Sequence, residues 1–283
     1  MDAILQVGGL CKKYDGFSLD DVSFSLPYGC IMGFVGENGA GKSTTVKAIL
    51  NLIRRDKGEI QVFGKDNIQS EQDIKERIGV VFDSLNLPVM IRPQDVGKMM
   101  QSIYHQWDQK KYLEYLERFQ LPAKKIIKDL SRGMKMKLAI AVALSHNAQL
   151  LLLDEATSGL DPIVRDEILD ILLEFIQDAS HGILFSSHIT SDLEKIADYV
   201  TFIHQGKILL SKPKDQLLEK YGVIKCSESE FSTLDQKAIV GVRRHQFGVE
   251  ALMEKEKIPS GTYIVDKASI EDIMLFIARG ERQ

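Results

Sequence analysis

The sequence predicts an α/β protein, and three observations support this fold class. Short apolar runs recur along the chain, as expected of strands buried on both faces of a parallel sheet; they lie at 30–35, 78–82, 150–153 and 182–187. Segments with helical spacing separate these runs. Several of the runs end in polar or acidic residues, which indicates that one edge of the sheet forms a functional site.

The remaining segments predict three additions to this core. Residues 1–29 alternate apolar and polar residues between Gly and Pro turns, which predicts an antiparallel β-subdomain. A helical pattern follows the strand at 78–82 and predicts a helical subdomain at about 84–147, with helices at 96–107, 110–119 and 134–144.

The character of the chain changes again near residue 212. Lys212-Pro213-Lys214 is typical of a linker, and the segment after it mixes short apolar runs with a final helix at 270–279. No phosphate- or metal-binding pattern occurs there. We therefore expect a nucleotide-binding domain over 1–211 and a small α+β accessory domain over 212–283.

Composition and charge narrow the class of protein. The chain has 283 residues, of which 44% are hydrophobic and 27% charged, as in ordinary globular proteins. The net charge of −4 provides no basic field for nucleic acid, so we expect no nucleic-acid partner. The three cysteines, Cys11, Cys30 and Cys226, are too widely spaced for a disulfide framework or a metal site, which favours a reducing compartment.

Membrane and export signals are weak in this sequence. No apolar run approaches the ~18 residues of a membrane span. The first residues have neither the basic start nor the apolar core of a signal peptide. We expect a cytoplasmic protein that acts on a membrane only through a partner.

Residues 36–44 carry the pattern G-x-x-x-x-G-K-S between an apolar strand and a helical segment. Such a loop points successive N–H groups, and the positive end of the following helix, at phosphate. Lys42 can place its charge near the β- and γ-phosphates, and Ser43 can ligate Mg²⁺. The residues expected to bind nucleotide here are Gly36, Glu37, Asn38, Gly39, Ala40, Gly41, Lys42, Ser43 and Thr44.

Two acids follow the leucine run at 150–153. Asp154 and Glu155 are expected at the carboxyl end of a buried strand, where α/β sheets bind ligands. Asp154 fits the carboxylate that holds Mg²⁺ in phosphate-loop NTPases, and Glu155 can reach a water that attacks the γ-phosphate. Two solvated acids are the alternative interpretation.

Two further side chains are candidates for the functional site because of their positions in the predicted strands. The run at 182–187 ends at His188, which a parallel sheet places at the same edge as Asp154 and Glu155; a structural histidine is the alternative. Tyr14, at the end of an early strand, can stack on a base or can simply pack.

With these stretches in place, residues 3–210 resemble the ATP-binding subunit of ABC transporters, which has a P-loop NTPase (RecA-like) core. Leu130-Ser131-Arg132-Gly133-Met134 lies where that family carries L-S-G-G-Q, and Ser158-Gly159-Leu160-Asp161 matches its D-loop. His188 matches the switch histidine and Tyr14 the adenine-stacking aromatic. The variant signature and the short C-terminal domain resemble those of ABC-2 type ATPases, which include antibiotic and peptide exporters.

The resemblance implies a head-to-tail dimer that holds two ATP molecules, with Mg²⁺, between its subunits. Ser131 and the Gly133 N–H would contact the γ-phosphate bound by the other subunit, at a helix start, and Asp161 would communicate across the dimer. Glu155 would polarise the attacking water and His188 would sense the γ-phosphate. Hydrolysis would drive a separate membrane permease for export of a peptide, an antibiotic or a similar compound, from the cytoplasmic face of the membrane.

The sequence departs from the family pattern at two places. Arg132 and Met134 replace the usual Gly and Gln of the signature, and Arg132 adds a charge that can reach phosphate or pair across the interface. Asp83 stands where the family has its Q-loop glutamine; it can ligate Mg²⁺ but only accepts hydrogen bonds, and a structural role is the alternative. Residues 84–107 would carry the permease-docking surface, with core packing as the alternative for their apolar side chains.

Two other functions are open to a chain with these motifs. A soluble ABC-type ATPase, not coupled to transport, is disfavoured because the insertion is short, one phosphate loop is present and no basic linker occurs. An unrelated P-loop GTPase or kinase is disfavoured because the N-K-x-D guanine motif is missing.

Overall fold

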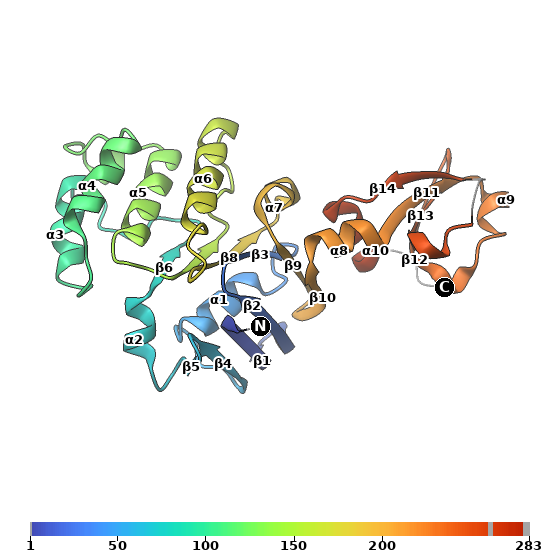
Figure 1. Cartoon of the computed structure of the whole chain (residues 1–283), viewed down its shortest axis with the longest axis horizontal. Coiled ribbons are helices and arrows are strands. Elements are labelled where there is room, and N and C mark those ends of the chain that lie inside the picture. The colour runs from blue at the N-terminus through green and yellow to red at the C-terminus, as the bar shows by residue number, and fades with distance from the viewer. Residues whose placement is uncertain (1, 260–262, 280–283) are drawn as a thin grey trace.

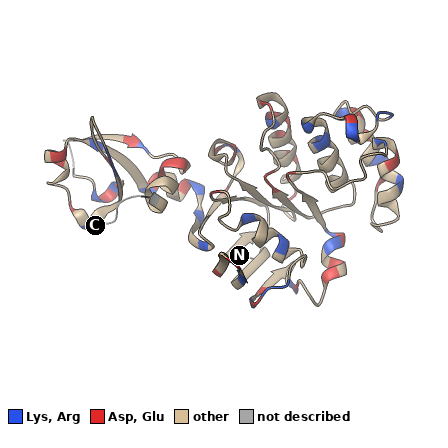
Figure 2. Ribbon diagram, turned by 180° about the vertical axis from the view of Figure 1, so that it is seen from behind, with Lys and Arg blue, Asp and Glu red and all other residues tan. Residues whose placement is uncertain are grey.

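The computed structural model describes residues 2–259 and 263–279. Figure 1 shows a large part formed by most of the chain and a smaller part at its C-terminal end. Three sheets organise these parts. Figure 2 shows Lys, Arg, Asp and Glu spread along both parts of the ribbon.

The central sheet has six strands in the order β10-β9-β3-β8-β7-β6. The strands are β3 (Cys30–Val35), β6 (Ile78–Val81), β7 (Leu150–Asp154), β8 (Gly182–Ser187), β9 (Tyr199–His204) and β10 (Lys207–Pro213). All neighbours pair in parallel except β10, which pairs antiparallel with β9. Every residue of β7 and β8 is buried, which explains their apolar sequences.

The register of this sheet sets up one polar edge. Asp154 of β7 lies opposite Ser186 of β8, and Val35 of β3 lies opposite Ser187. The phosphate loop therefore begins beside the two acids, because parallel strands bring their carboxyl ends to one edge.

The predicted antiparallel β-subdomain is confirmed. Its sheet has the order β2-β1-β4-β5, with β1 (Ala3–Tyr14), β2 (Phe17–Pro27), β4 (Lys57–Val62) and β5 (Lys65–Asp66). One hydrophobic cluster joins it to the central sheet through Leu10, Val22 and Phe34, together with Val46 of α1 (Lys42–Ile49). The phosphate-loop helix is thus packed into the core that connects the two sheets.

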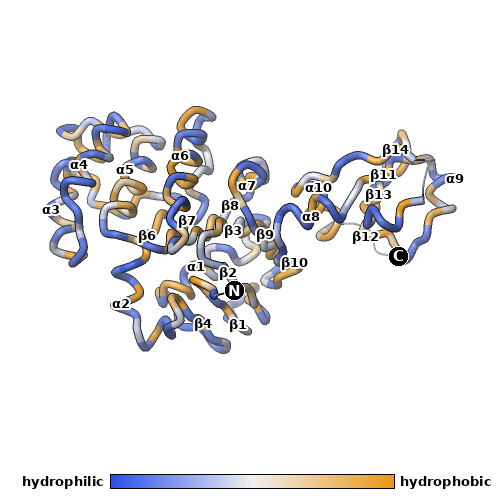
Figure 3. The backbone as a smooth tube through the Cα atoms, viewed as in Figure 1, coloured by the Kyte–Doolittle hydropathy of each residue, from blue (hydrophilic) through white to orange (hydrophobic). Residues whose placement is uncertain are grey.

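The predicted helical insertion lies between β6 and β7. It contains α3 (Pro93–Gln101), α4 (Gln109–Arg118), the 3₁₀ turn η1 (Ile127–Asp129) and α5 (Arg132–Leu144), while α2 (Glu71–Glu76) precedes β6. Figure 3 shows that α3 and α4 are largely hydrophilic in colour, whereas hydrophobic residues run along the central strands.

The first predicted helix of the insertion is displaced. It was expected over 96–107, but α3 begins at Pro93 and ends at Gln101. Proline is favoured in a first helical turn, since its missing N–H costs nothing there. Residues 102–107 lie outside a helix, and Asp108 then caps α4 from an extended conformation, where its side chain accepts from Lys111 N at 2.9 Å.

Two helices connect the strands that end at the polar edge. They are α6 (Pro162–Phe175), between β7 and β8, and α7 (Thr190–Ile196), between β8 and β9. Within the described residues, no helix is long and apolar enough to cross a membrane.

The C-terminal part is α+β, as predicted. Its sheet has the antiparallel order β12-β13-β11-β14. The elements are α8 (Lys214–Lys220), β11 (Tyr221–Cys226), α9 (Glu228–Phe231), η2 (Gln236–Ala238), β12 (Ile239–His245), β13 (Gly248–Glu254), η3 (Lys255–Lys257), β14 (Ile264–Lys267) and α10 (Ile270–Arg279).

The linker interpretation of 212–214 is wrong. Lys212 and Pro213 pair with Val200 and Tyr199 as the last residues of β10, and Lys214 begins α8. Proline is tolerated there because β10 is the edge strand of the sheet. The boundary between 211 and 212 stays a prediction, and it falls within this strand.

Candidate nucleotide site

The phosphate loop connects the end of β3 to α1 and leaves no room for a side chain at two of its glycines. A Cβ at Gly36 would lie 2.4 Å from the carbonyl oxygen of Ile203. Gly41 has a φ of 116°, and a Cβ there would lie 2.5 Å from Leu19 Cδ2. By contrast, the Gly39 position opens on free space. The loop is therefore packed against the protein on one side and open to a ligand on the other.

Lys42 is 5% exposed and folds back over this loop. Its Nζ donates to the carbonyl oxygens of Gly36 at 2.7 Å and Glu37 at 3.2 Å. The same Nζ forms an ion pair with Glu155 Oε1 at 3.1 Å. The two carbonyl acceptors and the facing carboxylate hold the ammonium group at the site where a phosphate oxygen would compete for it.

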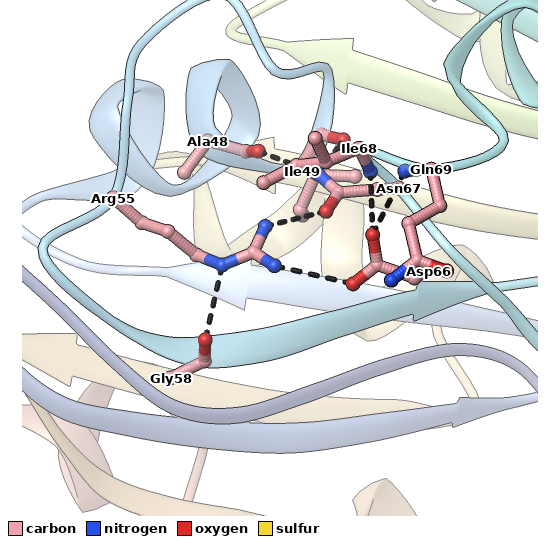
Figure 4. Close-up of polar contacts among 8 residues, drawn as sticks. All are labelled: Ala48, Ile49, Arg55, Gly58, Asp66, Asn67, Ile68 and Gln69. Carbon is pink, nitrogen blue, oxygen red and sulfur yellow. Dashed lines mark hydrogen bonds and ion pairs between the residues drawn. The ribbon is translucent and has the colours of Figure 1, made fainter.

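The far end of the phosphate-loop helix is anchored by Asn67, which is 1% exposed (Figure 4). Its Nδ2 donates to the carbonyl oxygens of Ala48 at 3.0 Å and Ile49 at 2.8 Å. Arg55 in turn donates to Asn67 Oδ1 at 2.5 Å and to Asp66 Oδ2 at 3.2 Å. The network satisfies carbonyl groups at the end of α1 and so fixes the direction of its N-terminus.

Asp154 and Glu155 lie where the sequence predicted, at the carboxyl end of β7. Asp154 is 5% exposed, and its Oδ1 accepts a hydrogen bond from Ser186 Oγ at 2.6 Å. Glu155 has a φ of 56°, in the left-handed region, and its N–H donates to Ser186 O at 3.1 Å. This turn directs the Glu155 side chain back over the sheet edge, so a non-glycine residue holds an uncommon backbone conformation at the site.

The Glu155 carboxylate lies between two basic groups. Oε1 faces Lys42, as described, and Oε2 lies 2.5 Å from Nδ1 of His188, whose side chain is 44% exposed. The Lys42 contact is an ion pair outside hydrogen-bond geometry, so the buried Oε1 has no hydrogen-bond donor among the described residues. An acceptor left free beside the phosphate loop is available to a water or ligand proton.

Tyr14 lines a pocket of about 520 Å³ at the other end of the loop. The pocket also includes Phe17, Gly39 and Gln205, so it is continuous with the phosphate loop. Tyr14 is 43% exposed, and Lys12 Nζ lies 5.4 Å from its ring centroid. The ring is therefore accessible to a base whose phosphates reach the loop.

The signature residues are at the start of α5. Ser131 caps this helix, with its Oγ accepting from Met134 N at 3.2 Å. Gly133 faces α6, because a Cβ there would lie 3.2 Å from Val164 Cγ1. The Arg132 guanidinium covers Gly159 of the D-loop, where a Cβ would meet its Nη1 at 2.9 Å. Signature and D-loop are thus packed against each other within one chain.

Asp161 caps α6 and therefore has a structural task in this chain. Its Oδ1 accepts from the N–H groups of Ile163 and Val164, both at 3.1 Å. The neighbouring Ile163 is 73% exposed, which is unusual for a large apolar side chain.

Asp83 follows β6 and lines a pocket of about 490 Å³ together with Arg132 and Lys135. The two departures from the family pattern, Asp83 and Arg132, therefore border the same pocket between the sheet and α5. Its role as a Mg²⁺ ligand stays a prediction.

Sequence reasoning missed two buried polar residues around this site. Ser186 supports Asp154, and its place in a strand ending in Ser-Ser-His was the available signal. Asp192, 3% exposed on α7, accepts from Thr157 Oγ1 at 2.8 Å and lies 3.7 Å from Arg165 Nη1. Burial raises the pKa of Asp192, opposed by the Thr157 hydrogen bond and the nearby cations. No local pattern marks Asp192, since its partners are distant in sequence.

Comparisons with known proteins agree with this arrangement. A family model described as ABC transporter matches residues 19–158. A bacitracin transport ATP-binding protein of Bacillus licheniformis is 34% identical over 250 residues, which cover 87% of this chain and 80% of that protein. A lantibiotic transport ATP-binding protein of Streptococcus pyogenes is 34% identical over 215 residues, or 75% of this chain and 92% of that protein.

A solved structure described as the ATP-binding subunit of an ABC transporter has a TM-score of 0.69. It is 25% identical and covers 76% of this chain and 91% of the other.

Proposed function

This chain belongs to the ABC transporter family as an ATP-hydrolysing subunit, and we propose that it powers export of a peptide antibiotic or a similar compound. The observation that carries the proposal is the contact of Glu155 with both Lys42 and His188 beside the phosphate loop. Transport of bacitracin and of a lantibiotic by its relatives supports the substrate class.

The chemistry of the site follows from these contacts. Lys42 supplies a positive charge for phosphate oxygens, which would replace its present carbonyl acceptors. Glu155 Oε1 has a free acceptor position, so it can orient a water for in-line attack on the γ-phosphate. His188 fixes the other carboxylate oxygen and is exposed enough to contact the γ-phosphate itself.

The donor set fits Mg²⁺ held partly by nucleotide phosphates. Ser43 lies in the first turn of α1, and Asp154 presents a carboxylate fixed by Ser186. Within the described ranges, no three His, Cys, Asp or Glu side chains are grouped to hold a metal by themselves. Bound Mg²⁺ would neutralise charge on the β- and γ-phosphates, with Ser43 and Asp154 as its protein ligands.

A second ATPase subunit is proposed to complete the site. Ser131 and Gly133 lie at the start of α5, where N–H groups favour an anion, and Asp161 lies at the start of the adjacent α6. The exposed Ile163 supports burial of this face against another subunit. In this arrangement the signature of one subunit covers the phosphate loop of the other.

The permease is proposed to dock in a pocket of about 650 Å³ between the sheet and the helical insertion. The pocket is mostly apolar, with Leu52, Phe82 and Ile103 in its wall and charged residues such as Glu71 and Lys75 around it. Leu52 and Ile103 are each 55% exposed. An amphipathic helix of a membrane protein matches this chemistry, and it would place the subunit at the cytoplasmic face of the membrane.

Most other apolar residues of the segment 84–107 serve the core instead. Met100 is 7% exposed, and Leu85, Leu87, Met99, Tyr104 and Trp107 pack against the buried cluster. Val89, Met90 and Ile103, which are 48%, 68% and 55% exposed, are the exceptions available to a partner.

The test of this function is capture of the permease by the ATP-bound subunit. Glu155→Gln protein with ATP, used as bait in detergent-solubilised membranes of its source cell, should retain a multi-span membrane protein. The same bait carrying Ile103→Glu should lose it, whereas Leu113→Glu, a change at another exposed apolar residue, should not. Recovery of soluble proteins alone would favour an ATPase that is not coupled to transport.

A further inference from the structure

The last helix of the chain contacts the helix that follows His188. α10 begins at Ile270, and its Ile270 N–H donates to Glu194 Oε1 of α7 at 2.7 Å. In the opposite direction, Thr190 Oγ1 of α7 donates to Glu271 Oε2 of α10 at 3.3 Å. Each helix thus supplies a carboxylate to the other, through residues in their facing turns.

The Glu194 contact uses the N-terminus of α10. Ser269 and Asp272 already form reciprocal hydrogen bonds across this first turn, at 2.6 to 3.0 Å. Ile270 N–H is a remaining donor at the positive end of the helix, and the carboxylate that satisfies it comes from the ATPase part of the chain.

Buried side chains anchor α10 in the hydrophobic core. Ile270, Ile273 and Phe276 are each 1% exposed. They belong to the same hydrophobic cluster as Leu193 and Ile196 of α7. Movement of α10 would therefore be transmitted to α7 through packing as well as through the two hydrogen bonds.

On its other side, α7 is tied to the site itself. Asp192 accepts from Thr157, which is two residues after Glu155. Leu193 fills the space beside Gly33 of β3, where a Cβ would lie 2.9 Å from its Cδ2. His188 is only two residues before α7, so the position of this helix sets the position of the histidine relative to Glu155.

A pocket of about 490 Å³ shows how closely α10 approaches the nucleotide site. Gly36 and His188 line one side of it, and Met274 and Leu275 of α10 line another. The C-terminal part of the chain therefore faces the phosphate loop across this pocket.

We propose that α10 is a positioning element of the ATPase site, which holds α7, and through it His188, against Glu155. Thr190, Glu194 and Glu271 are the positioning residues that connect the two helices. The small C-terminal domain then sets the rate of hydrolysis, in addition to any contribution to stability. This inference rests on the role proposed above for His188.

The test weakens the junction from the α7 side only, so that the C-terminal domain keeps its own sequence. Thr190→Val removes the hydroxyl donor at nearly constant shape, and Glu194→Gln removes the charge that faces the N-terminus of α10. The double variant should lose about three- to tenfold in kcat for ATP hydrolysis, with KM for ATP within about twofold of the parent. Thr190→Ser, which keeps the donor, and Glu256→Gln, at an exposed acid of the C-terminal domain, should behave as the parent.

A second measurement separates positioning from a merely structural effect. In a His188→Ala background, the double variant should lower kcat no further, because its effect passes through the histidine. Parent-like turnover of the double variant, beside an impaired His188→Ala protein, would overturn the positioning role. An equal further loss in the His188→Ala background would overturn it as well. Normal turnover of His188→Ala alone would instead remove the proposed role of His188, and this inference with it.

Discussion

Nδ1 of His188 lies 2.5 Å from Oε2 of Glu155, so the residue after one buried strand contacts the residue after its neighbour. The contact exists because β7 and β8 pair in parallel, with Asp154 opposite Ser186. It leaves Glu155 Oε1 directed toward Lys42. The expected chemistry of the site follows from this arrangement of one carboxylate between two basic groups.

Lys42→Ala should abolish measurable ATP binding or weaken it at least tenfold, because the ammonium group is the cation closest to the phosphate loop carbonyls. Binding of a fluorescent ATP analogue measures the effect. Lys47→Ala changes an exposed lysine of the same helix and is the matched control. Equal affinity of the Lys42→Ala and parent proteins would contradict the phosphate-loop assignment.

Tyr14→Ala should weaken ATP binding by about 5- to 150-fold, since base–aromatic stacking contributes about 1–3 kcal/mol. Tyr14→Trp should retain most of the affinity, because it preserves a π-face at the 520 Å³ pocket. A titration with ATP and with inorganic triphosphate distinguishes the base from the phosphates. If both Tyr14 variants lose affinity equally for both ligands, Tyr14 serves packing and not base recognition.

Asn67→Ala should destabilise the protein by about 1–3 kcal/mol, because it leaves two carbonyl groups of α1 and the Arg55 guanidinium without their buried partner. Thermal unfolding and urea denaturation measure the change. Gln69→Ala, at an exposed position two residues away, should change stability by less than about 0.5 kcal/mol. An unchanged midpoint for Asn67→Ala would mean that water replaces the amide without cost.

His146 should make the stability of the protein depend on pH. It is 1% exposed and stacks on Tyr104 with ring centroids 3.9 Å apart. Burial lowers its pKa below the ordinary 6.5, against the raising effect of hydrogen bonds to the carbonyl groups of Ile78 and Val142. The unfolded chain then binds more protons than the folded one just below pH 6.5, so this residue costs stability as the pH falls through that range.

The measurement compares the parent with His146→Gln, whose side chain does not titrate. Unfolding free energies from urea curves at pH 7.5, 6.5 and 5.5 should show the parent losing more stability than the variant on acidification. A difference between the two proteins that is constant with pH would show that His146 keeps its ordinary pKa on folding.

Much of this site was predictable from sequence because its residues follow buried strands. The apolar runs fixed the sheet, and the residues after them, Glu155 and His188, came to one edge by the geometry of parallel pairing. The phosphate loop was predictable because the pattern G-x-x-x-x-G-K-S, placed between a strand and a helix, is specific for phosphate binding.

The parts that sequence reasoning missed depend on long-range contacts. Asn67 and Asp192 are single polar residues whose side-chain partners lie 12 to 35 positions away, so neither belongs to a local pattern. Strand β13 is not among the elements expected from sequence, and the residues at its centre, Ala251-Leu252-Met253, favour a helix by propensity. Only its pairing with β11 and β12 makes it a strand.

The central claim is that Glu155 directs hydrolysis while the rest of the site binds ATP. Its most direct test is single-turnover ATP hydrolysis by Glu155→Gln at saturating ATP and Mg²⁺, together with the dimer fraction measured by size-exclusion chromatography. The account predicts at least a 100-fold slower reaction, unchanged ATP affinity and a lasting ATP-bound dimer. Glu114→Gln, an exposed acid of the helical insertion, should match the parent. Parent-like hydrolysis by Glu155→Gln would contradict the account, because another group would then have to orient the attacking water.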